Sequence, residues 1–389
     1  MKMKLPGGVR EAMARLEKAG HAVWLVGGCV RDALRGQTPH DYDLTTSARP
    51  DELLRLFADR PCVLAGLCHG TVAPVFDRTP IEITTFRREG PYADHRRPGS
   101  VCFVDSLEED LSRRDFTINA IAWHPSRGLR DPFGGELDLD RRLIRAVGEP
   151  DLRFEEDALR LLRALRFAAR FSFSVEERTA RALRSRASTL SLIALERITD
   201  ELRGFFALAS CGPLFAAFPE VFSALFPPLA GSSGWEETAR ALAAFSGGAL
   251  PRLALISRQA GESVTPYLRL TRREVAETDA LFAALCAPPP ETLGQVKRLA
   301  ARSVAFASDL LGLWQALGQE TDALGEQLLA AVERGDCLSR KDLALKGADL
   351  SDLPPAAIGE ALNRALEGVF DGRVPNEKNA LLAYIREKG

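Results

Sequence analysis

The sequence predicts an α+β fold, in which strands and helices alternate up to about Asp140 and helices alone follow. Short apolar or β-rich runs separated by turn residues recur in the first part, at HAVWLVGG, HDYDLTT, GTVAPVF, IEITTF and NAIAW. From Leu152 onward such runs stop, and helical patterns follow one another with Pro/Gly-rich breaks at FPPLAGSSGW and CAPPPET. A mixed sheet with helices is therefore expected first, and an all-helical part after it.

Composition narrows the class of protein. The chain has 389 residues, enough for several domains, and its formal net charge of −2 gives no overall attraction to nucleic acid, so RNA binding requires local basic patches. No apolar stretch approaches membrane-spanning length, no signal peptide is visible, and the seven cysteines show no CxxC pairing. No histidine follows His124, which excludes a His/Asp phosphohydrolase centre in the later two-thirds. We expect a cytoplasmic protein with no membrane association.

The first candidate site begins where the apolar strand HAVWLVGG runs into Gly27 and Gly28. Glycines let the backbone approach a ligand closely, and the following helix, which carries Arg31, offers N–H groups to an anion. Asp41 and Asp43 read as one strand, whose alternating geometry places both carboxylates on one face. Such a pair suits two divalent metals held about 4 Å apart for phosphoryl or nucleotidyl transfer. A plain turn and a solvated strand edge are the alternatives, but the connected order favours function.

This unit, GGxVRDxLxG…DxDLxT, resembles the first motif of the DNA polymerase β-like nucleotidyltransferases. It is most similar to that of the bacterial-type (class II) CCA-adding tRNA nucleotidyltransferase and poly(A) polymerase family. The resemblance implies a nucleotidyltransferase head in which Asp41 and Asp43 hold two Mg²⁺ ions, while Gly27, Gly28 and Arg31 bind the nucleotide's phosphates.

The second motif is SRRDFTINAIAW, from Ser112, which resembles the family signature RRDFTxNA. The resemblance implies that Arg114 and Asp115 lie beside the incoming nucleotide, at its triphosphate and ribose hydroxyls; a charged turn entering a core segment is the alternative. Upstream, Glu82 is either a third acid near the metals or a surface residue at a sheet edge. The segment Arg87–Pro98 has no periodicity and is predicted to be a long mobile loop, which in the family is needed to add A after C.

A helix near Glu156, EEDALRLLRALRFAARF, carries an arginine-rich arc that either faces solvent or binds a ligand. Its match to the family pattern EDxxR favours binding. Asp157 and Arg160, one helical turn apart, are expected to meet a base side by side. A carboxylate accepts from the exocyclic amine of cytosine or adenine and rejects the carbonyl oxygen of uracil or guanine. Arg163 and Arg166 continue the arc and are expected to reach phosphates.

The predicted organisation has four parts: a catalytic head over residues 1–140, a base-selecting neck over 141–205, a helical body over 206–300 and a tRNA-binding tail over 301–389. The resemblance implies template-independent addition of C, C and A to the tRNA 3′ end from CTP and ATP, with release of pyrophosphate. The tRNA is expected to be bound at its 3′ end and elbow, and no obligate protein partner is evident. An A-adding-only enzyme, a poly(A) polymerase and a catalytically inactive RNA-binding protein remain the alternatives.

Overall fold

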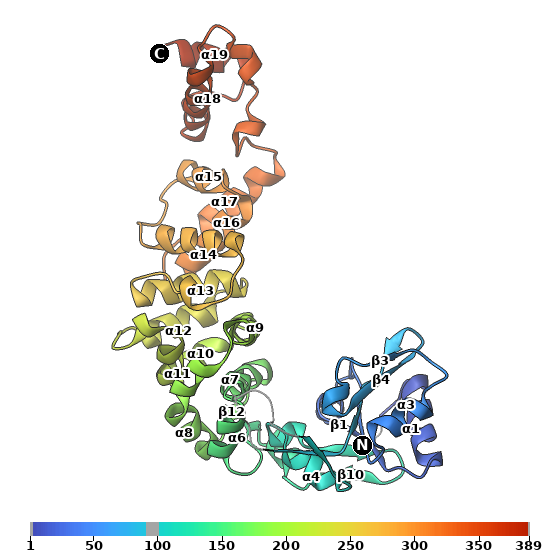
Figure 1. Ribbon diagram of the computed structural model, residues 1–389. Helices are drawn as coiled ribbons and strands as arrows, with labels where there is room; N and C mark the ends of the chain where they lie inside the picture. Colours follow the sequence, from blue (N-terminus) through green and yellow to red (C-terminus); the bar gives the residue numbers. More distant parts are fainter. Residues whose placement is uncertain (1–2, 91–100, 388–389) are drawn as a thin grey trace. The chain divides into compact units, whose positions relative to one another are not determined.

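A computed structural model of the protein describes residues 3–90 and 101–387, which divide into two compact units. The first comprises the residues up to Leu202 together with Glu220–Leu225, and the second comprises Arg203–Pro219 and Phe226–Gly389. The predicted boundaries at residues 140, 205 and 300 are not tested by this division and stay predictions. The strands gather in the blue and cyan part of the ribbon, and helices follow from green to red (Figure 1). The predicted α+β class is confirmed.

A mixed sheet forms the centre of the first unit, in the order β10-β9-β1-β2-β6-β4-β3, with β5 paired to β4. β1 and β2 are antiparallel, whereas β2 and β6 are parallel. The strands are β1 (Val23–Val26), β2 (Asp43–Thr46), β3 (Cys62–Val63), β4 (Thr71–Phe76), β5 (Thr79–Pro80), β6 (Ile83–Thr85), β7 (Arg87–Glu89), β8 (Val101–Phe103), β9 (Ala122–His124), β10 (Gly128–Arg130), β11 (Leu143–Ile144) and β12 (Ser174–Val175). Because β1 is buried along its whole length, it reads in the sequence as a continuous apolar run.

Two details differ from the sequence-based expectation. β7 pairs with β8, so the predicted loop Arg87–Pro98 begins as a strand; the rest of that loop, from residue 91, lies outside the described residues. Beyond Leu152, where only helices were expected, the short strand β12 pairs in parallel with β11. Two-residue strands carry too little alternation to be recognised in a sequence.

Helices and helical turns make up most of the remaining chain. Up to Phe206 they are α1 (Gly7–Lys18), α2 (Gly28–Leu34), α3 (Pro50–Leu56), η1 (Leu67–His69), α4 (Leu107–Ser112), η2 (Thr117–Asn119), α5 (Gly135–Asp140), α6 (Pro150–Glu156), α7 (Leu159–Phe171), α8 (Glu177–Ser185), η3 (Ala187–Leu192) and α9 (Leu195–Phe206). α7 buries an apolar face that includes Leu161, Leu165 and Ala168, as its periodicity predicts.

The later helices continue in the same way to the end of the described chain. They are α10 (Cys211–Ala217), α11 (Pro219–Leu225), η4 (Pro227–Leu229), α12 (Trp235–Ala244), α13 (Ala249–Ala260), η5 (Thr265–Tyr267), α14 (Arg272–Leu285), α15 (Leu293–Ala300), α16 (Val304–Ala316), α17 (Asp322–Glu333), η6 (Arg340–Asp342), η7 (Gly347–Leu350), α18 (Pro355–Phe370) and α19 (Lys378–Glu387). A separate apolar cluster around Leu345, Ala365 and Leu381 packs α18 against α19. Among the described residues, no helix combines the length and apolar character needed to span a membrane.

Candidate active site

The turn after β1 lies directly beside Asp43, because Val26 at the end of β1 pairs with Asp43 at the start of β2. Gly27 has φ +73° and ψ −134°, a backbone conformation that residues with a side chain rarely adopt. A Cβ atom on Gly27 would lie 3.2 Å from Nη1 of Arg114. β1, Gly27 and α2 thus form the predicted strand–turn–helix, and the bare glycine leaves room for an arginine of the second motif.

The three predicted acids come together at the adjoining strand ends. Leu44 pairs with Ile83 in the parallel β2–β6 ladder, and the Leu44 N–H donates to the Glu82 carbonyl at 2.9 Å, which sets Glu82 next to Asp43. Asp41 lies in a bend, so the prediction that Asp41–Asp43 is strand was wrong; β2 begins at Asp43. Burial raises the pKa of Asp43, and the charges of Glu82 and Asp41 raise it further, while Arg114 opposes them.

These carboxylates suit a metal ion whose remaining ligands come from the substrate. Across residues 3–90 and 101–387, no group of three or more His, Cys, Asp or Glu side chains is arranged to hold a metal ion by itself. Mg²⁺, however, is usually held by one or two carboxylates together with substrate phosphates rather than by a closed protein cage. The charges of Glu82 and Asp41 repel that of the half-buried Asp43 carboxylate, and a bound cation would reduce this repulsion. The donor set of Asp41 and Asp43 therefore fits Mg²⁺.

Arg114 and Asp115 of the second motif occupy the turn after α4. Asp115 accepts hydrogen bonds from Asn119 at 3.0 Å and from Arg163 at 2.7 Å. Burial alone would raise the pKa of Asp115, but the charge of Arg163 and these hydrogen bonds outweigh it and lower the pKa to about 2. Asn119 also accepts from Arg31 at 2.7 Å, so Asp115 and Arg31 are joined through one amide.

The carboxylate of Asp110 is fully buried and forms hydrogen bonds with several segments around the site. The sequence analysis did not identify this residue. It accepts from the Thr45 hydroxyl at 3.0 Å, from the Arg87 N–H at 3.3 Å and from Arg113 at 2.8 Å, and it pairs with Arg114 at 3.4 Å. Burial would raise the pKa of Asp110, but Arg113 and Arg114 outweigh it and the pKa is lowered. Asp110 thereby connects β2, β7 and the second motif.

We expect Asp110→Asn to destabilise the fold and to raise KM for the nucleotide. Breaking a buried ion pair typically costs about 3–5 kcal/mol, because the remaining charges of Arg113 and Arg114 stay buried without their partner. The midpoint of thermal unfolding and the KM for CTP measure the two effects. Asp105→Asn, at a carboxylate that is 85% exposed, is the matched control and should change neither. Wild-type stability and KM in Asp110→Asn would contradict the role of this network.

Asp157 and Arg160 do not lie on one continuous helix, so that prediction was wrong. α6 ends at Glu156, Asp157 has an extended backbone with φ −141° and ψ 102°, and α7 begins at Leu159. The Asp157 carboxylate accepts from the Leu159 N–H at 3.1 Å and from Arg197 at 2.9 Å. The physical reason is that Asp competes with helical hydrogen bonds by accepting from the backbone two residues on.

The α7 arginines are held by neighbouring groups. Arg160 is buried and donates to Glu156 at 2.7 Å and to the Arg113 carbonyl at 3.1 Å. Arg163 pairs with Asp115, and Arg166 pairs with Glu201 at 2.5 Å. Each guanidinium therefore has a fixed direction before any ligand arrives, which reduces the entropy lost when one binds.

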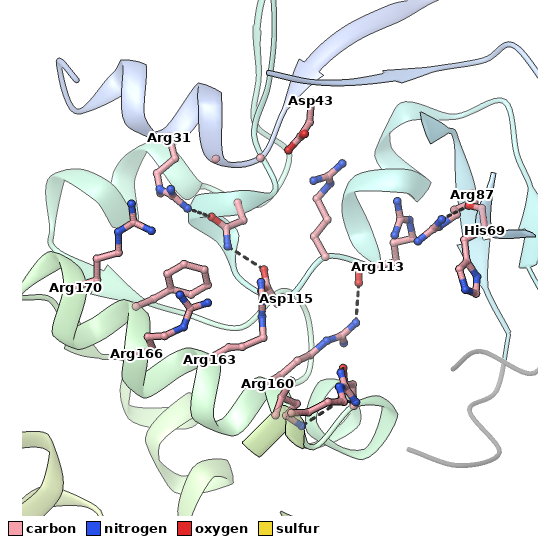
Figure 2. A pocket seen from close by; sticks show the side chains of 18 residues that line it. Arg31, Asp43, His69, Arg87, Arg113, Asp115, Arg160, Arg163, Arg166 and Arg170 are labelled. Atoms are coloured by element: carbon pink, nitrogen blue, oxygen red, sulfur yellow. Dashed lines mark hydrogen bonds and ion pairs between the residues drawn. The ribbon is translucent and has the colours of Figure 1, made fainter. Parts of the chain in front are cut away.

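A cavity of about 620 Å³ brings most of the predicted residues together (Figure 2). Its predicted lining residues are Gly27, Gly28, Arg31, Asp43, Arg114, Asp115, Asp157, Arg160, Arg163 and Arg166. In Figure 2, Arg31, Arg166 and Arg170 lie on one side of Asp43, and His69, Arg87 and Arg113 lie on the other. Asp41 and Glu82 lie outside this cavity and line a second one of about 550 Å³; Asp43 lines both.

Several lining residues were not singled out in the sequence. These are His69, Arg87, Arg113, Asn119, Leu159, Phe167, Arg170 and Arg197. Arg113 and Asn119 belong to the RRDFTxNA motif, so the motif could have indicated them as site residues. His69 ends the short helical turn η1, which the left-handed Gly70 closes, so its position is set by the local segment GLCHGTV.

Comparison with known proteins identifies the family of the chain. A family model described as the Poly A polymerase head domain matches residues 23–145, and a model of tRNA nucleotidyltransferase domain 2 matches residues 266–385. A CCA-adding enzyme of Geobacillus thermodenitrificans (strain NG80-2) is 37% identical over 391 residues, covering 96% of this chain and 95% of the relative. The chain belongs to the CCA-adding enzyme family. Another family member, from Lactobacillus delbrueckii subsp. bulgaricus (strain ATCC BAA-365 / Lb-18), is 34% identical and covers 96% of each chain.

Solved structures of CCA-adding enzymes share the fold. That of the Bacillus stearothermophilus enzyme in complex with CTP has a TM-score of 0.79 and 32% identity, covering 99% of this chain and 98% of that one. That of the Thermotoga maritima enzyme complexed with tRNA has a TM-score of 0.72 at 22% identity, a likeness of fold. As a member of the CCA-adding enzyme family the chain is a nucleotidyltransferase, so the predicted family and enzyme class are confirmed.

Proposed function

We propose that this chain is a CCA-adding tRNA nucleotidyltransferase, which adds C, C and A to the tRNA 3′ end from CTP and ATP and releases pyrophosphate. The observation that carries the proposal is the position of Asp43, which lines both an arginine-rich cavity and the cavity of Asp41 and Glu82. We assign the nucleoside triphosphate to the first cavity, because of its arginines, and the RNA end that receives the nucleotide to the second. The relative solved with CTP supports the choice of nucleotide.

In this proposal the reaction is divided among residues of the two cavities. Asp41 and Asp43 would hold two Mg²⁺ ions, with Glu82 as a third acid. When bound, Mg²⁺ lowers the pKa of the attacking 3′-hydroxyl and neutralises charge on the triphosphate. Gly27 and Gly28 leave space for phosphate oxygens, while Arg31 and Arg114 donate to them in the fixed directions of a planar guanidinium. Asp115 orients Arg163 and would accept from the ribose hydroxyls.

Base selection is assigned to Asp157 and Arg160. Asp157 is held in place by Arg197, and a carboxylate so fixed accepts from an exocyclic amine but repels a carbonyl oxygen. Arg160 donates to the ring nitrogen or carbonyl oxygen beside that amine. Cytosine and adenine share this pattern, so one pair of residues selects both without a nucleic-acid template.

A cytoplasmic location belongs to the same proposal. All seven cysteines are free thiols, and burial raises the pKa of the Cys29 thiol, behind the glycine turn, to about 11. Thiols persist where the compartment is reducing.

The test is to incubate the enzyme with tRNA transcripts that lack CCA, end in C or end in CC, with CTP and ATP separately and together. With both nucleotides, we expect all three transcripts to end in CCA. With CTP alone, the transcript that lacks CCA should gain two cytidines, the one that ends in C should gain one, and the one that ends in CC should gain none. With ATP alone, only the transcript that ends in CC should be extended. An A-adding-only enzyme extends only the CC transcript. A poly(A) polymerase adds long A tails, and an inactive RNA-binding protein binds without extension; any of these three outcomes overturns the proposal.

A further inference from the structure

Two cavities of the first unit share Tyr42, the residue between Asp41 and Asp43. One is the cavity of Asp41 and Glu82, of about 550 Å³, and the other has a volume of about 230 Å³. The smaller cavity is lined by Met3, Lys4, Ala33, Gly36, Gln37, Thr38, Pro39 and Tyr42, and none of these residues lines the arginine-rich cavity. Asp43 and Tyr42 therefore connect three cavities in sequence.

The order of these cavities agrees with the geometry of nucleotidyl transfer. In an in-line displacement, the attacking oxygen and the leaving group lie on opposite sides of the phosphorus. With the triphosphate in the arginine-rich cavity, the attacking RNA end occupies the cavity of Asp41 and Glu82, beyond Asp43. The strand continues from its terminal nucleotide, and the cavity that adjoins this one is the smaller cavity, at Tyr42.

The smaller cavity has the size and chemistry of a site for one nucleotide of a strand. At about 230 Å³ it is smaller than the sites of about 300–1,000 Å³ that enclose whole small molecules, so it suits part of a longer ligand. Half-buried Tyr42 offers an aromatic ring, and exposed Lys4 offers a positive charge. Across the described residues, Lys4 forms no ion pair, and no carboxylate lines this cavity. These groups match a stacked base and a neighbouring phosphate.

An aromatic ring also suits the changing sequence at this position. Each addition moves the RNA strand by one nucleotide, so different bases reach the same place in successive steps. A site that reads hydrogen-bonding edges would reject some of them, whereas every base presents a π-face to an aromatic side chain. Tyr42 can therefore hold the strand in each step without selecting its sequence.

We propose that the smaller cavity is a subsite for the penultimate nucleotide of the RNA end. Tyr42 stacks on the base of that nucleotide, and Lys4 contacts a phosphate beside it. The terminal nucleotide then lies in the cavity of Asp41 and Glu82. The inference rests on the proposed function for the identity of the RNA, but RNA binding is measurable without nucleotide transfer.

The test uses a fluorescein-labelled RNA minihelix with a single-stranded 3′ end in CC, and the same RNA with an abasic penultimate nucleotide. Fluorescence anisotropy measures its affinity for the full chain, without CTP or ATP, at several salt concentrations. Tyr42→Leu should weaken binding of the intact RNA at least about fivefold, and Tyr42→Phe should restore most of it. The abasic RNA should bind wild type at least about fivefold more weakly, and Tyr42→Leu should weaken its binding no further.

The charge of Lys4 has a readout of its own. Lys4→Gln should reduce the slope of log affinity against log salt concentration by about 0.7, the value for one phosphate of a single strand. Lys18→Gln, at an exposed lysine at the end of α1, is the matched control and should change neither affinity nor slope. Because Lys4 is exposed, its variant tests the subsite even if Tyr42→Leu does not fold.

The outcomes separate this inference from the function on which it rests. Wild-type RNA affinity in both Tyr42→Leu and Lys4→Gln overturns the subsite, even if CCA is added normally. An equal loss for intact and abasic RNA in Tyr42→Leu overturns it as well, because the residue then acts through the fold and not on the base. So does a higher KM for CTP with unchanged RNA affinity, since these residues then serve the nucleotide. If all expected differences appear but no nucleotide is added to tRNA, the subsite stands and the proposed function fails.

Discussion

Asp43→Asn is expected to lose the addition of C and of A together, by at least about a thousandfold in kcat, because a carboxylate that would hold both metals supplies several kcal/mol to the transition state. The addition of C and the addition of A both depend on this carboxylate, which lines both cavities, so both rates should fall. Asp41→Asn should behave alike. Single-nucleotide extension of a radiolabelled tRNA transcript with Mg²⁺ as the only metal measures the effect.

The matched control is Asp51→Asn, at an exposed carboxylate of α3, which should leave both steps unchanged. Folding and tRNA affinity should survive in every variant, since Asp43 forms no buried ion pair among the described residues. Glu82→Gln distinguishes two roles for this residue. If Glu82 is a third metal-binding acid, the loss of activity should be similar to that of Asp43→Asn. If Glu82 is a sheet-edge carboxylate, its only effect is to raise the pKa of Asp43, and the loss should be smaller. Near-normal turnover of Asp43→Asn would refute the metal assignment.

Asp157→Asn is expected to lower the preference for CTP over UTP at least about tenfold while nucleotide transfer continues. The amide has nearly the shape of the carboxylate but presents N–H donors where the carboxylate accepts, so a uracil carbonyl is no longer repelled. One directed contact of this kind is worth about 1–3 kcal/mol. The ratio of kcat/KM for CTP and UTP, on a transcript lacking CCA, is the measurement.

Arg197→Gln provides the comparison, because it releases the Asp157 carboxylate from its ion pair without changing its acceptor character. It should reduce selectivity less than Asp157→Asn does. An unchanged ratio in Asp157→Asn would show that this residue does not read the base. An equal loss in both variants would mean that the direction of the carboxylate, set by Arg197, decides the choice.

Local chemistry made part of this site predictable. Gly27 and Asp43 were recognisable because a strand, a positive-φ turn and a second strand are close in sequence, and their pairing follows from that closeness. Asp157 was placed on a helix because the apolar period continues through it, although an Asp just before a helix is itself a capping signal. Asp110 was missed because its partners Thr45 and Arg87 lie 65 and 23 residues away in the sequence, and only the folded chain brings them to it.

The chain leaves the helical conformation between α6 and α7, at the residue assigned to the base. Inside a helix, a residue cannot change φ or ψ without breaking hydrogen bonds on both sides. The Asp157 N–H donates to the Arg153 carbonyl of α6 over a long distance of 3.4 Å. The Arg160 guanidinium of α7 also donates to α6, to Glu156 at 2.7 Å and to the Arg153 carbonyl at 3.2 Å. The two helices are therefore separate hydrogen-bonded segments that one guanidinium connects, so the direction of the Asp157 carboxylate depends on side-chain contacts rather than on a continuous helix.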